Sequence, residues 1–236
     1  MGSLDGKIIA VTGANRGIGL AIARQLSQEG ARLILLGRDR RALARAVRSL
    51  SGEAQGIVGD VTESRDVERI FTTMRRSTSR LDVLVNNAGV FTSKPFARTT
   101  LKDWRANLET NLTSIFLVTR AALPLLQRSR GAHLINILSV AGRVAFANCS
   151  AYCASKFGAL GLTGVLREEL RPHGIRVTAI LPGSTDTRQA DEFDFPVDRK
   201  KLIQPEDLAA AVLAALLQPA RTTVEEILLM PSSGKL

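Results

Sequence analysis

Aromatic, histidine and cysteine side chains are scarce in this chain of 236 residues. Aromatic residues make up 4% of it, with a single tyrosine and a single tryptophan, which leaves little for stacking against nucleobases. Two cysteines cannot form a disulfide framework, so a reduced, cytoplasmic setting is expected. The two histidines, His133 and His173, have no cluster of metal-ligating residues around them. We expect both at the surface, and no metal site.

Long apolar runs and targeting signals are also lacking. No stretch of about 18 apolar residues is present, so no membrane span is predicted. The N-terminal MGSLDGKIIAVTG leads almost directly into a strand-like run and has no signal-peptide pattern. The net charge of +10 makes nucleic-acid binding a candidate, but the arginines are spread along the chain without a helix-turn-helix or zinc-finger spacing. A basic surface that attracts an anionic cofactor or substrate is the simpler interpretation, and no nucleic-acid partner is expected.

Short apolar runs alternate with helical patterns along the whole chain. The runs are continuous rather than alternating, which is typical of strands buried on both faces and favours a parallel sheet with helices on both sides. No long linker or repeat divides the chain, so we predict one α/β domain over residues 1–236, with a doubly wound parallel sheet. The predicted strands are 7–13, 31–37, 55–61, 81–89, 132–139, 175–183 and 225–231, and the predicted helices are 18–28, 39–50, 63–76, 101–128, 151–171 and 205–217.

A glycine-rich turn, TGANRGIG, lies between the first predicted strand and the first predicted helix. Gly13, Gly17 and Gly19 would let backbone amides approach a phosphate, and the helix N-terminus adds a partial positive charge. The spacing is G-x-x-x-G-x-G rather than the commoner G-x-G-x-x-G. Three glycines are often only a turn, but the strand before and the helix after favour dinucleotide binding.

The end of the second predicted strand bears on the choice of cofactor. An acidic residue there would hold the adenosine ribose hydroxyls, but the position is Gly37, followed by Arg38. With Arg16 inside the glycine turn, two guanidinium groups are available for a 2′-phosphate. We therefore predict NADP(H) over NAD(H); the alternative is that both arginines are solvated surface charges.

The only tyrosine lies in the stretch YCASK, from Tyr152 to Lys156. An isolated tyrosine–lysine pair at this spacing is usually a pair of surface or packing residues. Here other motifs accompany it in order: TGANRGIG, Asp60-Val61, NNAG at 86–89, Asn111, Ser139 thirteen residues before the tyrosine, and Pro182-Gly183. Together they resemble the short-chain dehydrogenase/reductase family over nearly the whole chain. The resemblance implies a Rossmann fold, a nicotinamide cofactor and hydride transfer at a carbonyl or alcohol carbon.

The resemblance also implies catalytic roles for Asn111, Ser139, Tyr152 and Lys156. Tyr152 would be the general acid or base, Ser139 would hydrogen-bond the substrate oxygen, and Asn111 would hold a water in the proton relay. A lysine ammonium one helical turn from the phenol favours the phenolate, so we predict a lowered pKa for Tyr152. In the family the lysine also binds the nicotinamide ribose.

Cofactor contacts follow from the same resemblance. Asp60 would meet the adenine edge, the NNAG segment would line the cleft, and Thr187 would touch the nicotinamide carboxamide. The predicted cofactor-binding residues are Gly13, Asn15, Arg16, Gly17, Ile18, Gly19, Arg38, Asp60, Val61, Asn87, Ala88, Gly89, Tyr152, Lys156, Pro182, Gly183 and Thr187.

The expected partners are a small-molecule carbonyl or alcohol substrate and further copies of the chain. The segment 184–204 is short and suggests a small or extended substrate. Apolar positions on more than one face of 115–125 and of 157–166 predict a homodimer or homotetramer, because the family commonly pairs these two helices. The alternative function is a non-catalytic NADP(H)-binding regulator; the complete set of four catalytic residues argues against it.

Overall fold

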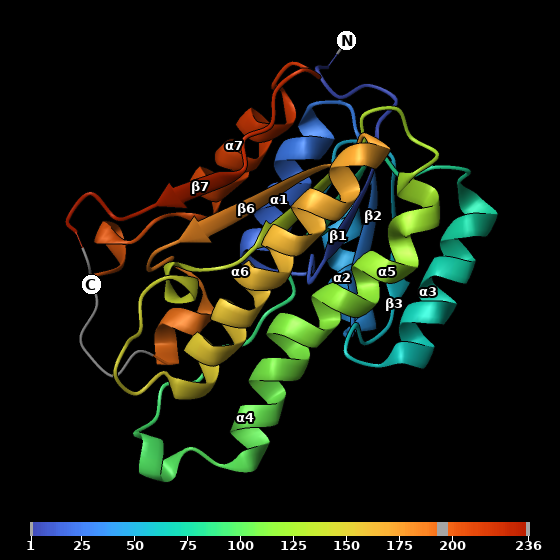
Figure 1. The fold of residues 1–236 in the computed structure, drawn as a ribbon. Coiled ribbons are helices and arrows are strands. Elements are labelled where there is room, and N and C mark those ends of the chain that lie inside the picture. Colours follow the sequence, from blue (N-terminus) through green and yellow to red (C-terminus); the bar gives the residue numbers. More distant parts are fainter. Residues whose placement is uncertain (1, 193–197, 235–236) are drawn as a thin grey trace.

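A computed structural model of the chain describes residues 2–192 and 198–234 (Figure 1). Within these residues, seven strands form one sheet in the order β3-β2-β1-β4-β5-β6-β7, and every neighbouring pair is parallel. The strands are β1 Ile8–Thr12, β2 Arg32–Gly37, β3 Ala54–Val58, β4 Val83–Asn86, β5 His133–Ile137, β6 Arg176–Pro182 and β7 Glu226–Leu229. The predicted doubly wound parallel sheet is therefore confirmed.

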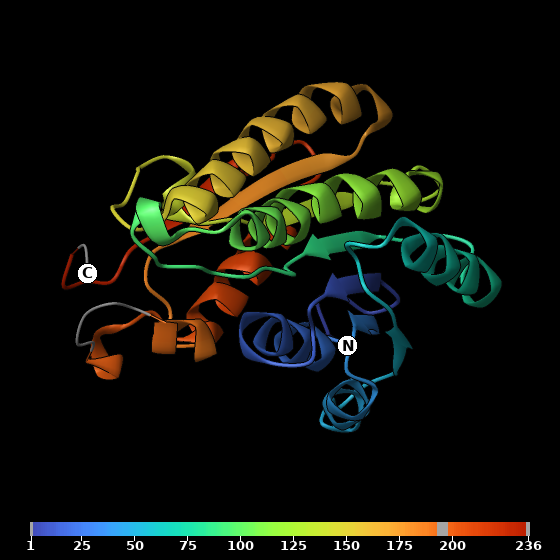
Figure 2. The same ribbon diagram turned by 90° about the horizontal axis from the view of Figure 1, so that it is seen from below.

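Helices cover both faces of the sheet (Figure 2). The α-helices are α1 Gly17–Gln28, α2 Arg40–Arg48, α3 Ser64–Ser77, α4 Leu101–Leu108, α5 Ser114–Leu126, α6 Ser150–Leu170 and α7 Pro205–Leu216. On one face, side chains of α1, α2 and α7 pack against the strands; on the other, side chains of α3, α5 and α6 do so. The sheet is thus buried from both sides, as continuous apolar strands require.

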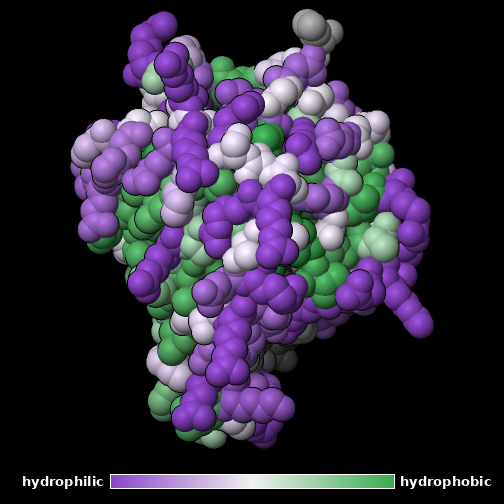
Figure 3. All heavy atoms as spheres, turned by 90° about the vertical axis from the view of Figure 1, so that its right-hand side faces the viewer, coloured by the Kyte–Doolittle hydropathy of each residue, from purple (hydrophilic) through white to green (hydrophobic). Residues whose placement is uncertain are grey.

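Successive residues of one strand belong to opposite cores. Ile9 of β1 packs with the α1 and α7 side chains, whereas the next residue, Ala10, packs with those of α3 and α5. The helices complement this by being amphipathic: α3 buries Phe71 and Met74 and turns its polar residues to solvent. Figure 3 shows this side of the molecule, where hydrophilic side chains surround smaller hydrophobic areas. No helix in the described residues is long and apolar enough to cross a membrane.

The surface position expected for His133 is wrong. The residue lies in β5 between β4 and β6, and only 1% of it is exposed. Its Nε2 hydrogen-bonds the Thr178 hydroxyl at 2.7 Å, which satisfies one ring nitrogen without a charge. Burial, followed by the charge of Arg176, lowers the pKa of His133 to about 3, so the ring stays neutral at physiological pH.

The region 101–128 contains a feature that the sequence patterns did not predict. A π-helical turn, Glu109–Thr113, joins α4 to α5. Such turns insert a residue into a helix and are frequent at functional sites. Here the turn contains Asn111, one of the four predicted catalytic residues.

Candidate functional site

A cleft of about 920 Å³ lies at the carboxyl ends of the central strands. This is the usual place for ligands in a doubly wound sheet, and the volume suits a cofactor-sized molecule. Its lining includes every predicted catalytic and cofactor residue except Gly19 and Asn111. The lining residues from the prediction are Gly13, Asn15, Arg16, Gly17, Ile18, Arg38, Asp60, Val61, Asn87, Ala88, Gly89, Ser139, Tyr152, Lys156, Pro182, Gly183 and Thr187.

The glycine turn at one end of the cleft depends on close backbone approach. Gly13 has a φ of +63°, and a Cβ there would lie 3.0 Å from the Ala88 Cα. Gly19 does not reach the cleft because it packs behind the turn, where a Cβ would lie 2.6 Å from the Gly13 carbonyl oxygen. The Asn87 side chain fixes this arrangement by donating to the Thr12 and Gly13 carbonyls at 2.9 and 3.2 Å. The glycine positions of the turn therefore leave its backbone open to close approach, as binding of a pyrophosphate requires.

The first turn of α1 faces the same space. Arg16 is its N-cap residue, and its side chain makes no capping hydrogen bond within the described chain. Helix N-terminal amides that are not capped by a side chain can bind an anion, and the helix dipole favours negative charge there. Thr187 comes close from the opposite wall, because a Cβ at Gly17 would lie 3.6 Å from its methyl group.

The two arginines predicted to hold a 2′-phosphate differ in their surroundings. Arg16 is exposed at the rim. Arg38 follows the last residue of β2 and forms an ion pair with Asp60 at 3.3 Å, while its side chain stays 68% exposed. Burial opposes ionisation of Asp60, but hydrogen bonds from Thr62 and the charge of Arg38 hold its pKa below the ordinary value. Asp60 is therefore ionised, and it orients the guanidinium while neutralising part of its charge.

Helix α6 places Tyr152 and Lys156 one turn apart, both facing the cleft. The Lys156 Nζ lies 5.7 Å from the centre of the tyrosine ring and donates to the Ile137 carbonyl at 3.4 Å. Ser139 follows β5 closely and lines the same part of the cleft. Its hydroxyl accepts a hydrogen bond from the Ala141 amide at 3.1 Å, which fixes its orientation beside the phenol.

The protein's own side chains shift both pKa values toward the neutral forms. Burial raises the pKa of Tyr152 to about 12, although hydrogen bonding by Ser139 opposes the rise. Burial lowers the pKa of Lys156 to about 8. The spacing of Tyr152 to Lys156 led us to expect a lowered pKa for the tyrosine. That expectation is wrong when the protein's own side chains alone set this pKa. Desolvation outweighs the hydrogen bond from Ser139, because apolar rings and two thiols pack around the phenol.

Asn111 is fully buried, and its side chain does not line the cleft. Its carbonyl accepts from the Val90 amide at 2.8 Å, and its amide donates to the Val90 carbonyl at 2.9 Å and to the Ser155 hydroxyl at 3.0 Å. The side chain therefore ties the loop after β4 to helix α6. Its hydrogen-bonding groups are engaged in this bracing, so a water would have to be held by the backbone of the π-helical turn.

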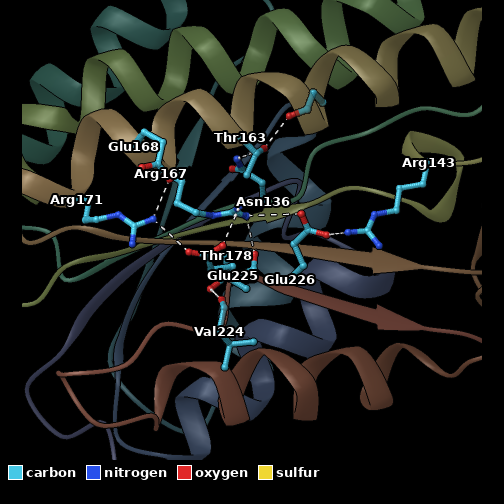
Figure 4. Close-up of polar contacts among 11 residues, drawn as sticks. Asn136, Arg143, Thr163, Arg167, Glu168, Arg171, Thr178, Val224, Glu225 and Glu226 are labelled. Atoms are coloured by element: carbon cyan, nitrogen blue, oxygen red, sulfur yellow. Dashed lines mark hydrogen bonds and ion pairs between the residues drawn. The ribbon is translucent and has the colours of Figure 1, made fainter.

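Polar contacts anchor α6 to the sheet below it (Figure 4). Asn136 of β5 donates to the Thr163 hydroxyl at 2.9 Å, and Arg167 donates to the Glu225 carbonyl at 2.8 Å. Glu226 at the start of β7 pairs with Arg167 at 3.9 Å and also with Arg143, just beyond Ser139. The two ion pairs of Glu226 connect the helix of Tyr152 and the loop of Ser139 to β7.

Several residues of the cleft were not predicted. Phe91, Phe146, Cys149 and Met230 also line it, and the first three pack in one cluster with Tyr152. No motif marks them, and only their hydrophobicity could have suggested burial. Phe193 and Phe195 of the segment 184–204 lie outside the described residues. Within the described residues, no cluster of three His, Cys, Asp or Glu side chains could hold a metal ion.

Comparisons with known proteins agree with this geometry. The family description of short chain dehydrogenases matches residues 7–195. An uncharacterized oxidoreductase of Staphylococcus aureus strain USA300 is 35% identical over 229 residues, covering 97% of this chain and 98% of the relative. The crystal structure of a metagenomic short-chain oxidoreductase in complex with NADP has 36% identity and a TM-score of 0.86, covering 98% and 99% of the two chains.

A second solved structure is an alcohol dehydrogenase from the archaeon Thermococcus sibiricus, complexed with 5-hydroxy-NADP. It has 26% identity and a TM-score of 0.88, and it covers 98% of each chain. The chain belongs to the short-chain dehydrogenase family of oxidoreductases.

Proposed function

We propose that this protein transfers a hydride between NADP(H) and a carbonyl or alcohol carbon, with Tyr152 as general acid and base. The observation that carries the proposal is the meeting of a phenol, a buried lysine and an oriented serine hydroxyl in one cleft with the glycine turn. A protein that only binds a nucleotide has no need of such a set.

The side chains have separate tasks in the reduction. When bound, NADPH supplies the hydride that reaches the carbonyl carbon. The Ser139 hydroxyl binds the carbonyl oxygen, and Tyr152 gives that oxygen its proton, so the product is an alcohol. The raised pKa of Tyr152 keeps the phenol protonated at neutral pH, the form that reduction requires. The phenolate left behind is stabilised by the nearby Lys156 ammonium and regains a proton from solvent.

The cofactor contacts support NADP(H) in particular. Gly37 leaves the end of β2 without a carboxylate, and Arg38 and Arg16 both line the cleft. Both solved relatives compared above contain NADP or an NADP derivative, which is the cofactor that these arginines would favour.

We also propose that the protein assembles as a homodimer or homotetramer through α5 and α6. Phe116 is 47%, Phe157 45% and Val165 53% exposed, although the other faces of these helices are buried in the core. Apolar side chains on a second helix face favour a second burial surface, which a symmetric contact between two copies would supply.

The direct test is NADPH consumption with a panel of aldehydes, ketones and β-ketoesters. The proposal predicts turnover with some of them, and loss of turnover in Tyr152→Phe with NADPH binding retained. A non-catalytic regulator would bind NADPH and reduce none of them, and that result would overturn the proposal.

A further inference from the structure

The two ends of the cleft have different neighbours. Its glycine-turn end carries the charged groups Arg16, Arg38 and Asp60. The guanidinium of Arg199, another cleft residue, is engaged by Asp186 at 2.7 Å and by Asp191. Around Tyr152 the neighbours are different: Phe91, Phe146, Ala141, Cys149 and Cys153 form one packed cluster with the tyrosine.

Phe91 makes the most specific of these contacts. Its ring centre lies 4.9 Å from that of Tyr152, and the two ring planes are at 81°, an edge-to-face arrangement. Phe146 comes from a different loop, between Ser139 and α6, and lies in the same cluster. Phe91, Phe146 and Tyr152 all line the cleft, so an occupant that reaches the phenol also meets the two phenylalanines.

Phe91 and Phe146 form an aromatic wall beside Tyr152. Hydrogen bonds hold in place the two loops that carry them. The Asn111 side chain fixes both the amide and the carbonyl of Val90, the residue before Phe91. The Lys94 amide donates to the Asn148 carbonyl at 2.7 Å and so joins the loop of Phe91 to the loop of Phe146. Asn148 has a φ of +63°, an uncommon conformation for a residue other than glycine. A wall braced by these contacts is formed before any substrate arrives.

We propose that Phe91, together with Phe146, selects carbonyl substrates that carry an aromatic group on the carbonyl carbon. The proposal rests on the proposed function. A substrate whose oxygen meets Tyr152 and Ser139 must place one substituent against these rings. A charged or strongly hydrated substituent would lose its solvation there, whereas an aromatic ring gains edge and face contacts. The same rings cover one side of the phenol and so contribute to the burial that dominates the acidity of Tyr152.

The test compares an aryl methyl ketone with a short dialkyl ketone in NADPH-dependent reduction. The unaltered protein should favour the aryl ketone in kcat/KM by about tenfold or more, and Phe91→Ala should remove most of that preference. Phe91→Leu keeps an apolar wall without the ring, so it should keep the folded structure and lose part of the preference. Phe96→Ala is the matched control, because Phe96 is 82% exposed and does not line the cleft.

A second readout does not depend on any substrate. Phe91→Ala admits water to the phenol, so the tyrosinate absorbance of the single tyrosine should appear at lower pH than in the unaltered protein and in Phe96→Ala. If Phe91→Ala reduces both ketones with an unchanged aryl-to-alkyl ratio of kcat/KM, the proposed selection by Phe91 is wrong and the proposed function still stands. Reduction of other carbonyls of the panel but of neither ketone would also overturn the proposed selection, whereas NADPH binding without reduction of any carbonyl of the panel would overturn the proposed function itself.

Discussion

Lys156 should make the folded protein less stable than an apolar side chain in its place. Its side chain is almost fully buried, and within the described residues its ammonium makes one hydrogen bond, the long contact of 3.4 Å to the Ile137 carbonyl. Burial lowers the pKa of this lysine from 10.5 to about 8. At 1.36 kcal/mol per pH unit, that gap corresponds to a destabilisation of about 3 kcal/mol at neutral pH, an upper bound for the gain on substitution.

The sign of the pH dependence follows from the lowered pKa. The unfolded chain binds the lysine proton up to about pH 10.5, whereas the folded protein releases it near pH 8. Protonation of Lys156 therefore favours unfolding. The destabilisation of the folded protein is complete below pH 8, decreases as the pH rises, and is absent above about pH 10.5. Lys156→Met fills the same space without a charge, so its stabilisation should be greatest at pH 7 and should vanish near pH 10.5.

The assay is urea unfolding of the unaltered protein, Lys156→Met and Lys102→Met at pH 7 and pH 10. Lys102 is an exposed lysine of α4, so its variant controls for the loss of a charge and for the added methionine. Lys156→Met should raise the free energy of unfolding by one to about 3 kcal/mol at pH 7 while abolishing turnover. A variant that is no more stable than the control at pH 7 would refute the reasoning that this lysine is a desolvated cation.

Three further predictions concern the cofactor, the phenol and the assembly. Arg38→Ala should weaken NADPH binding about ten- to hundredfold and leave NADH binding nearly unchanged, as measured by fluorescence titration; equal losses for both cofactors would contradict the 2′-phosphate contact. The tyrosinate band of Tyr152 should appear near pH 12 in the folded protein and near 10 in the unfolded chain, and stability should fall between these values; a folded midpoint at or below 10 would contradict the desolvated phenol. Light scattering should give a multiple of 25.4 kDa, and Phe157→Arg should shift it toward that monomer mass; a monomer at all micromolar concentrations would reject the assembly.

The fold was predictable because its signals are local. Continuous apolar runs such as Ile8–Thr12 identify buried strands, and the glycines that follow identify the turn that joins strand to helix. The carboxyl ends of parallel strands meet at one edge of the sheet. Residues far apart in the sequence, such as Gly13, Asn87 and Ser139, therefore come together once the strand order is known.

The features that were missed depend on packing. A spacing of four residues predicts that Tyr152 and Lys156 are neighbours on a helix, but it does not reveal that Phe91 and Phe146 surround the phenol. The sign of the pKa shift was therefore wrong, because desolvation depends on loops whose positions no local pattern encodes. The bracing role of Asn111 was missed for the same reason, since its partners lie in a loop and in another helix.

Transfer of deuterium from NADPH labelled at the reactive C4 position shows whether this protein moves a hydride to a carbonyl carbon. The protein is incubated with the labelled cofactor and an aryl methyl ketone, and the alcohol is analysed by mass spectrometry. The unaltered protein should place one deuterium on the carbinol carbon, and Tyr152→Phe should bind the cofactor with similar affinity and form no labelled alcohol. If Tyr152→Phe forms labelled alcohol at an undiminished rate, Tyr152 is not the general acid. If the unaltered protein binds the cofactor but transfers no deuterium to this or any other carbonyl of the panel, it is not a reductase of these substrates.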